Sequence, residues 1–230
     1  WRAARSTRPT SSPGVEGVKA LVTGFEPFGG DAINPSSLAV SRLQDRIGNT
    51  AVHTAVLPCS FARSTAVLRA AIDEAKPDLV LCVGLAGGRS ELCLERVGIN
   101  VQDARIPDND ASQPIDVPVV KGGPAAHFAT LPIKACVAEM RKAGLPAAVS
   151  NTAGTFVCNH ILYALMDMAA HAKRPFRGGF LHVPNVPEML PAGSSAPSVP
   201  VETIVRGIEI IVAVSAGRSD DIHTAEGRIS

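Results

Sequence analysis

Apolar runs alternate with amphipathic segments along most of the chain. The runs that predict buried strands are 18–23, 51–57, 79–83, 147–149 and 178–184, and a partly alternating segment at 91–100 predicts a further strand. Apolar residues spaced three and four apart predict helices over 34–45, 60–75, 131–143, 156–168 and 201–215. Apolar strands separated by helices are typical of a parallel sheet covered on both faces. The pattern therefore predicts an α/β fold, a mostly parallel twisted sheet with helices on both faces.

The first 17 residues do not share this pattern. They carry Arg2, Arg5 and Arg8 among serine, threonine and proline, with no acidic residue before Glu16 and no apolar core of a secretory signal. We expect residues 1–17 to be a disordered extension or a segment added in cloning, and residues 18–230 to form one domain. At 230 residues the chain has room for one sizeable α/β core.

Composition excludes several classes of partner. With 46% hydrophobic residues and 22 basic against 21 acidic side chains, the chain is globular and nearly neutral, so we expect neither nucleic acid nor a membrane as partner. No apolar run is long enough to span a bilayer. The five cysteines are odd in number and form no CxxC pair, which indicates neither a disulfide framework nor a zinc site and fits a reducing cytoplasm.

Several predicted strands end in loops that could hold a ligand. In open parallel sheets, ligands bind beyond the carboxyl ends of the strands. The loops at those ends are 24–30, 84–89, 102–123, 151–158 and the segment after residue 182. Glycine-rich turns leave phosphate binding open, although neither GxGxxG nor GxxxxGK[ST] is present. The polar stretch 102–123 is long for a connection in a compact domain, which favours a functional role.

Cys158 follows one of these loops. The segment 150–160, Ser-Asn-Thr-Ala-Gly-Thr-Phe-Val-Cys-Asn-His, passes from a strand through a turn into the first turn of a helix. Unpaired N–H groups and the helix dipole favour an anion there, so a thiol loses its proton more easily and an oxyanion can be bound. Plain core packing is the alternative, since cysteine is among the most buried residue types.

A histidine and a carboxylate could complete a catalytic group. His182 lies in an apolar strand one residue before the chain leaves the sheet, and Glu95 lies in another mostly apolar strand. A core histidine, and an ion pair of Glu95 with Arg96 or another arginine, are the structural alternatives. A thiol, an imidazole and a carboxylate can act as nucleophile, base and orienting group. The rival carboxylates Glu26, Asp108 and Asp110 are better suited to caps and turns.

With these residues in view, the chain resembles the pyroglutamyl peptidase I (pyrrolidone-carboxylate peptidase) family of cysteine peptidases. The resemblance spans about residues 18–225. It rests on five blocks in the family's order: LVTGFEPFGGDAINPS, CVGLAGGRSELCLERVGINVQDARIPDND, GGPAAHFATLPIK, SNTAGTFVCNHILYALM and GGFLHVP. It implies a hydrolase that removes an N-terminal pyroglutamyl residue from peptides through a thioester.

The resemblance also assigns roles to residues. It implies that Cys158 is the nucleophile, His182 the general base and acid, and Glu95 the third member of the triad, with Arg105 near the oxyanion. The residues that it places at the pocket for the lactam ring are Phe25, Phe28, Ile106, Phe156 and Val157. It further implies no metal or organic cofactor and a cytoplasmic homo-oligomer, typically a tetramer.

Two positions depart from the family pattern. Leu85 stands where many members have glutamine, which could alter affinity or selectivity for the lactam, and Gly98 stands where others have alanine. Two alternatives remain open at this point. The architecture also resembles that of nucleoside phosphorylases, and a non-catalytic ligand-binding protein on the same scaffold would keep the same core pattern.

Overall fold

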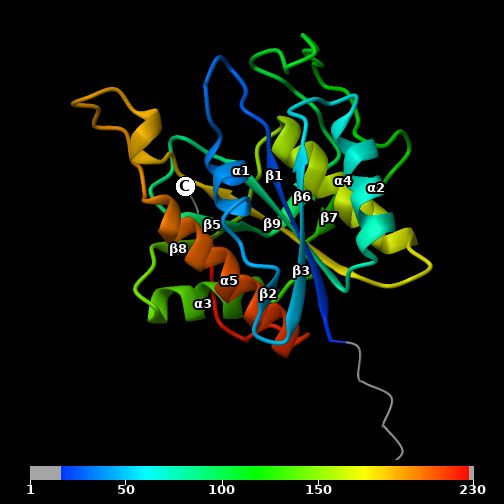
Figure 1. The fold of residues 1–230 in the computed structure, drawn as a ribbon. Helices are drawn as coiled ribbons and strands as arrows, with labels where there is room; N and C mark the ends of the chain where they lie inside the picture. The colour runs from blue at the N-terminus through cyan, green and yellow to red at the C-terminus, as the bar shows by residue number, and fades with distance from the viewer. Residues whose placement is uncertain (1–16, 228–230) are drawn as a thin grey trace, which may run out of the picture.

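The computed structural model describes residues 17–227, in which strands and helices alternate along most of the chain (Figure 1). The strands are β1 Lys19–Phe25, β2 Arg46–Ile47, β3 Thr50–Leu57, β4 Leu79–Leu85, β5 Leu92–Glu95, β6 Val97–Ile99, β7 Ala126–Phe128, β8 Ala147–Ser150 and β9 Arg177–Val183. The helices are α1 Pro35–Val40, α2 Ser64–Ala75, α3 Ile133–Lys142, α4 Val157–His171 and α5 Val201–Gly217, with a short 3-10 helix η1 at Pro187–Met189. The predicted tail lies, except for Gly17, outside the described residues, and the one-domain assignment of the rest stays a prediction.

A seven-stranded sheet forms the centre, in the order β2-β3-β1-β4-β9-β5-β8. Strands β3, β1, β4 and β9 are mutually parallel, and β5 and β8 are parallel to each other. Two junctions are antiparallel: β2 with β3 at one edge, and β5 with β9 inside the sheet. The predicted α/β fold with a mostly parallel sheet is confirmed, although the sheet is mixed.

Each face of this sheet is covered by its own set of helices. Helices α1, α3 and α5 pack on one face, where β1 and β4 contribute alternate residues such as Val22 and Leu81. Helices α2 and α4 pack on the other, over the intervening residues such as Leu21 and Cys82. Figure 1 shows the two helix groups on either side of the strands. Because both faces are buried there, the middle strands β1, β4 and β9 are mostly apolar, as their sequences predicted, whereas β3 carries the exposed His53 and Thr54.

Some predicted elements end earlier than expected. The predicted strand 91–100 is two strands, because the chain turns at Arg96 and β6 pairs with β7 in a separate two-stranded sheet. The first helix begins as predicted, with Asn34 as its side-chain cap and Pro35 at the first position. It ends at Val40 instead of near residue 45, since the chain then enters the hairpin of β2 and β3. The short strands β2 and β7 were not predicted.

Strand direction also differs from the expectation for the site. Residues of β5 pair with β9 as Cys93 with His182 and Leu94 with Leu181, so β5 runs away from the edge at which β1, β4 and β9 end. The rule that all carboxyl ends meet at one edge therefore holds for β1, β4 and β9 but not for β5 and β8. Glu95 approaches His182 along a neighbouring antiparallel strand.

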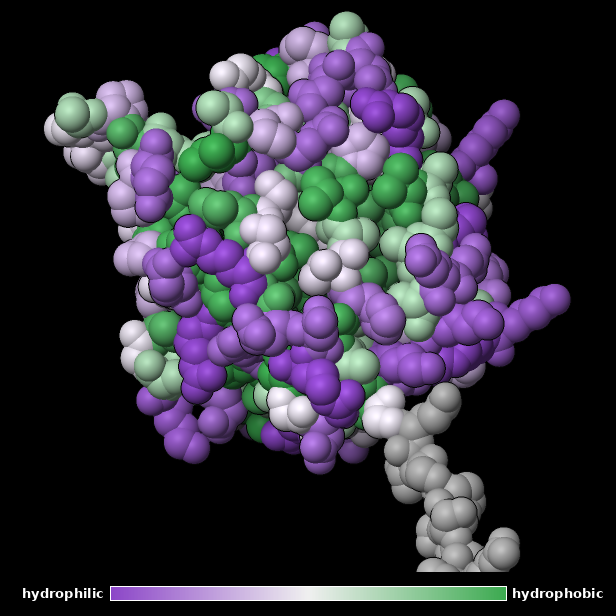
Figure 2. Space-filling view, in the orientation of Figure 1, coloured by the Kyte–Doolittle hydropathy of each residue, from purple (hydrophilic) through white to green (hydrophobic). Residues whose placement is uncertain are grey.

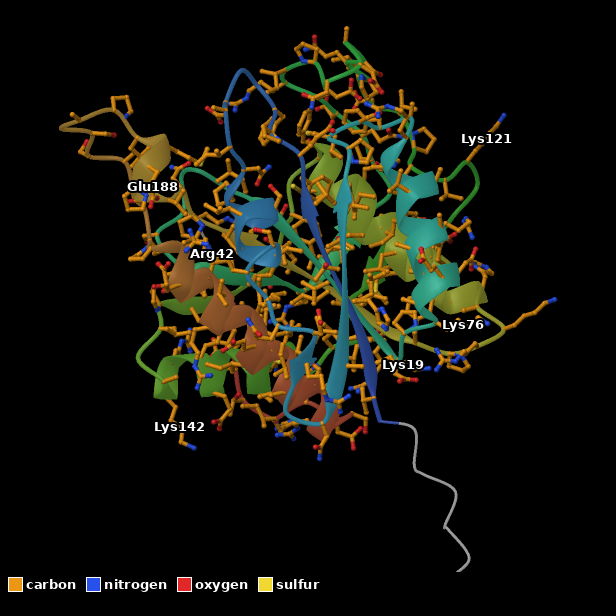
Figure 3. All side chains as sticks on the ribbon, in the orientation of Figure 1. Lys19, Arg42, Lys76, Lys121, Lys142 and Glu188 are labelled. Atoms are coloured by element: carbon orange, nitrogen blue, oxygen red, sulfur yellow. The ribbon has the colours of Figure 1, made fainter. Side chains whose placement is uncertain are left out.

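Charged side chains lie mainly on the outside of the molecule. On the face shown in Figure 2, hydrophilic residues are spread along the borders and hydrophobic ones gather toward the middle. Lys121 and Lys142, labelled in Figure 3, project away from the body. Among the described residues, no helix has both the length and the apolar character needed to cross a bilayer.

Truncation of Leu94 tests the packing of the central sheet. Leu94 is fully buried on β5 within the core under α3 and α5. Leu94→Ala should lower the free energy of unfolding by about 2–5 kcal/mol, because it leaves a cavity in a close-packed layer. The matched control is Val56→Ala on β3, where the residue is 51% exposed and the change should stay within about 0.5 kcal/mol. Urea unfolding of both variants gives the comparison, and equal losses would contradict the assignment of this core.

Candidate active site

A cavity of about 310 Å³ lies where β1, β4 and β9 end and α4 begins. The residues that line it are Phe25, Phe28, Asn34, Cys59, Leu85, Ala86, Arg89, Thr152, Ala153, Gly154, Thr155, Phe156, Val157, Cys158 and His182. The structure thus brings Cys158 and His182, from distant parts of the chain, to the same cavity. Glu95 stands directly behind His182, as the hydrogen bonds show.

Glu95 and His182 form a buried pair. Oε1 of Glu95 lies 2.7 Å from Nδ1 of His182, and the two residues are 0% and 4% exposed. A carboxylate accepts, so Nδ1 carries the proton and donates, which leaves Nε2 of the ring as an acceptor. The ring of Phe180 packs against the imidazole with centroids 4.9 Å apart. The imidazole is therefore held in the tautomer that a general base needs.

Cys158 is the second residue of α4, directly after Phe156 as cap and Val157. Its Sγ lies over Gly84, the residue that pairs with His182 in the sheet. A Cβ at Gly84 would stand 2.9 Å from Sγ of Cys158 and 2.8 Å from Cζ of Phe180. The missing side chain of Gly84 therefore makes the space in which the thiol lies next to the strand that carries His182.

The surroundings of the thiol favour its protonated form. Burial raises the pKa of Cys158 well above its usual range; nearby Cys59 and Glu95 add to this and Arg89 opposes it. The helix N-terminus favours the charged form, so the expectation that it makes a thiolate easier to form stays a prediction. A thiol with a raised pKa needs a neighbouring base to lose its proton, and His182 lines the same cavity as Cys158.

The start of α4 can stabilise negative charge beside the thiol. The first N–H groups of a helix have no partner within it, and no side chain caps this end or adds an acid to its first turn. Asn159, the next residue, is fully buried and holds the helix in place by bonding the N–H and the C=O of Ile99 and the C=O of Val101, each at 2.9 Å. Sequence reasoning missed this anchor.

The expected pocket residues divide into two groups. Phe25, Phe28, Phe156, Val157 and Leu85 all line the cavity. The rings of Phe28 and Phe156 lie 6.1 Å apart, so aromatic and aliphatic side chains form most of its wall.

The other two expected residues lie outside this wall. Arg105 is exposed and Ile106 is 38% exposed, and neither belongs to the lining residues. They follow Asp103, whose N–H and C=O are bound by the backbone and the hydroxyl of Thr155 at 3.0 and 2.7 Å. Their segment is therefore anchored beside the cavity, and their roles stay predictions.

The long loop 102–123 joins the parts of the site. Asn109 donates to Oε1 of Glu26 and to the carbonyl of Pro27, both at 2.9 Å. Asp108 accepts from the N–H of Phe61 at 2.8 Å, and Asp110 binds Arg63 and Ser60. These carboxylates stabilise turns, as their sequence context predicted. Hydrogen bonding of Asp110 to Arg63 and Ser60 lowers its pKa to about 2.

Arg89 is the site residue that sequence reasoning overlooked. It donates to Oε1 of Glu95 at 2.6 Å and to the carbonyl of Thr152 at 3.0 Å. The arginine that pairs with Glu95 is thus Arg89; Arg96 binds Asn151 and the carbonyl of Glu226. The position of Arg89 in a glycine-rich strand-end loop was a signal, because it is the only charged residue of the loop 84–89.

The other four cysteines belong to the core, and Cys59 also lines the cavity. Cys59, Cys82, Cys93 and Cys136 are buried, as predicted. Burial raises the pKa of Cys82 to about 12, and burial together with Asp108 raises that of Cys59 to about 12. Within residues 17–227, no group of three histidine, cysteine, aspartate or glutamate side chains is arranged to hold a metal ion.

Comparison with known proteins decides the family. The family model described as pyroglutamyl peptidase matches residues 18–218. The chain belongs to the pyroglutamyl peptidase family. The pyrrolidone-carboxylate peptidase of Erwinia tasmaniensis is 53% identical over 210 residues, which is 91% of this chain and 98% of that protein. The pyrrolidone-carboxylate peptidase of Streptomyces coelicolor is 53% identical over 212 residues, which is again 91% of this chain and 98% of that protein.

Solved structures agree with this assignment. Pyroglutamyl peptidase I from Bacillus amyloliquefaciens superposes with a TM-score of 0.88 at 47% identity, over 91% of this chain and all of that one. Pyrrolidone carboxyl peptidase from Thermococcus litoralis superposes with a TM-score of 0.86 at 38% identity, over 90% of this chain and 99% of that one. The predicted resemblance and the enzyme class, a cysteine-type omega peptidase, are confirmed by membership of the pyroglutamyl peptidase family.

A side chain at Gly84 should disturb the thiol of this pyroglutamyl peptidase family member. Gly84→Ala forces Cys158 and Phe180 to move, and a displacement of about 1 Å can cost about 10²-fold in turnover. The overpacking should also lower the free energy of unfolding by about 1–3 kcal/mol. Gly88→Ala is the control, since nothing lies within 4 Å of its added Cβ. Turnover of a pyroglutamyl-amide reporter and urea unfolding measure both effects; equal activity in the two variants would contradict the placement of the thiol.

His160 should make stability depend on pH. Its Nε2 lies 2.7 Å from Oγ1 of Thr65, its Nδ1 has no hydrogen-bond partner among the described residues, and burial lowers its pKa to about 4. Above about pH 6.5 the ring of His160 is neutral in both the folded and the unfolded state, so its contribution to the free energy of unfolding is fully present. As pH falls from about 6.5 to 4, the unfolded state takes up the proton first, and stability falls by up to about 3 kcal/mol.

The measurement is urea unfolding of the wild type and of His160→Gln between pH 7 and 4. The variant should lose less stability over this interval than the wild type does. His53→Gln, at an exposed position, should follow the wild type. Parallel curves for the wild type and His160→Gln would show that this ring is not the titrating group.

Proposed function

We propose that this chain hydrolyses the amide bond after an N-terminal pyroglutamyl residue of peptides, with Cys158 as nucleophile. The observation that carries the proposal is the pairing of His182 with Glu95 at 2.7 Å in a cavity that Cys158 also lines. Family membership supports the same activity, since the related proteins are named pyrrolidone-carboxylate peptidases. Family membership counts against a nucleoside phosphorylase. The complete set of thiol, imidazole and carboxylate argues against a purely binding role.

The first half of the reaction forms a thioester. Nε2 of His182 takes the proton from Sγ of Cys158, and the thiolate adds to the pyroglutamyl carbonyl carbon. The oxygen becomes an oxyanion that the free N–H groups at the start of α4 stabilise, with Arg105 in the role that the resemblance implies. The C–N bond then breaks as His182 passes its proton to the leaving amine. The shortened peptide departs with a free N-terminus.

The second half restores the enzyme. Nε2 of His182 takes a proton from water, and the resulting hydroxide adds to the thioester carbonyl. Collapse of the tetrahedral intermediate breaks the C–S bond, and the sulfur takes the proton back from His182. Pyroglutamic acid leaves the cavity. Glu95 stays ionised through both halves and stabilises the imidazolium that forms twice.

The shape of the cavity suits the pyroglutamyl ring. This ring is compact, flat and uncharged, so aromatic and aliphatic walls can enclose it, and backbone groups can bind its amide N–H and C=O. Phe25, Phe28, Phe156 and Val157 supply such walls in a volume of about 310 Å³. Leu85 extends the apolar wall where many family members place an amide side chain, so recognition of the lactam here relies more on the backbone.

The proposal includes the setting that the resemblance implies. The substrates are peptides with an N-terminal pyroglutamyl residue, and the chemistry uses side chains and water. The protein acts in the cytoplasm as a homo-oligomer, a tetramer by family resemblance. The exposure of Phe128 (67%) and Ile115 (62%) is compatible with contacts between copies.

Removal of the thiol tests the mechanism. Cys158→Ala should keep the fold but lower kcat/KM for a pyroglutamyl-amide reporter by about 10⁴-fold or more, because no nucleophile remains. Iodoacetamide should inactivate the wild type with modification of Cys158, since the other four cysteines are buried and Cys158 is partly exposed. Cys136→Ala is the control, because that thiol lies in the core away from the cavity and its loss should leave turnover and inactivation unchanged. Full activity in Cys158→Ala would overturn the mechanism.

A further inference from the structure

Arg89 binds the same carboxylate oxygen as the catalytic histidine. Nη1 of Arg89 and Nδ1 of His182 lie 2.6 and 2.7 Å from Oε1 of Glu95. The other oxygen, Oε2, is buried and has no hydrogen-bond partner among the described residues. Arginine and histidine are therefore coupled through one atom, and the guanidinium neutralises the carboxylate that orients the imidazole.

The same guanidinium reaches the segment that carries the nucleophile. Nη2 of Arg89 donates to the carbonyl of Thr152 at 3.0 Å, in the loop that leads into α4 and Cys158. Arg89 and Thr152 also line a second cavity of about 350 Å³. The two residues that this hydrogen bond joins therefore line both cavities.

We propose that Arg89 is a positioning residue of the catalytic group: it fixes Glu95 toward His182, joins the triad to the loop of Cys158, and keeps the imidazole free to accept a proton. The role rests on the proposed hydrolysis at Cys158. It follows from geometry, because one planar side chain bonds both the carboxylate of Glu95 on β5 and the carbonyl of Thr152 in the loop after β8.

Charge balance gives the proposal a measurable consequence. With Arg89 present, the pair of Arg89 and Glu95 is neutral, and a neutral imidazole completes a neutral site. Without Arg89, the buried carboxylate of Glu95 stabilises the protonated imidazole of His182. The coupled thiol and imidazole then lose their protons less easily. The titratable groups around them are the thiols Cys59, Cys82, Cys93 and Cys158 and the charged side chains Arg89, Glu91 and Glu95.

The experiment compares Arg89→Met and Arg89→Lys with Arg96→Met. Arg96 is the matched control, because it is a nearby arginine that binds Asn151 and the carbonyl of Glu226 instead of the triad. In Arg89→Met, kcat/KM for a pyroglutamyl-amide reporter should fall about 10²-fold and the acid limb of its pH profile should move up by about one unit. Arg96→Met should keep both within about twofold of the wild type.

Arg89→Lys separates charge from bridging. Lysine keeps a cation beside Glu95 but cannot bond the carboxylate and the carbonyl of Thr152 with one planar group. Its acid limb should therefore stay near that of the wild type, while kcat falls about tenfold with KM little changed. A wild-type kcat in Arg89→Lys would overturn the bridging role, and this test holds even where Arg89→Met fails to fold.

A second readout does not depend on turnover. The rate of alkylation of Cys158 by iodoacetamide, followed by mass spectrometry of its peptide, reports loss of the thiol proton in each variant. The midpoint of the alkylation rate as a function of pH should move to higher pH in Arg89→Met and remain in place in Arg96→Met. Coincident curves for folded Arg89→Met and wild type would overturn the proposal. Should the wild type fail to hydrolyse the reporter, the proposed function would fall while these curves still decide the role of Arg89.

Discussion

A carboxylate buried inside a sheet is the constraint on which this site depends. Glu95 is fully buried, and an ionised group in that position is tolerated only when charged or polar partners surround it. Arg89 from the loop after β4 and His182 from β9 supply those partners through a single oxygen. The free-energy cost of burying the charge of Glu95 is offset by its hydrogen bonds to Arg89 and His182. The same bonds fix the orientation of the imidazole, so they both stabilise this part of the sheet and position the site residues.

The reversal of strand direction is what makes this arrangement possible. In a wholly parallel sheet, Glu95 would lie at the end of its strand, level with the other strand ends. Because β5 runs antiparallel to β9, Glu95 pairs deeper in the sheet and reaches His182 diagonally, behind the cavity. The nucleophile comes from the helix layer, on the first turn of α4, over the one position in β4 that has no side chain. Acid and thiol thus approach the imidazole from different layers.

Much of this could be predicted from the sequence, and the limits have physical reasons. Apolar runs located most strands and helices, and Asn34 and Pro35 marked the start of α1, because these signals act over a few residues. The break at Arg96 and the direction of β5 depend on contacts with β7 and β9, which local patterns do not encode. Likewise, the family resemblance singled out Cys158, His182 and Glu95, whereas Arg89 and Asn159 act through bonds to segments far away along the chain.

The position of β9 has a consequence for how the protein is made. This strand is synthesised after β8 yet lies between β4 and β5, so it joins the two parts of the sheet. Until residue 183 has left the ribosome, the nascent polypeptide exposes two unsatisfied strand edges, each able to recruit the wrong neighbour. Assembly of the centre is therefore a late, long-range event, and the last strand to enter the sheet is the one that brings in the imidazole.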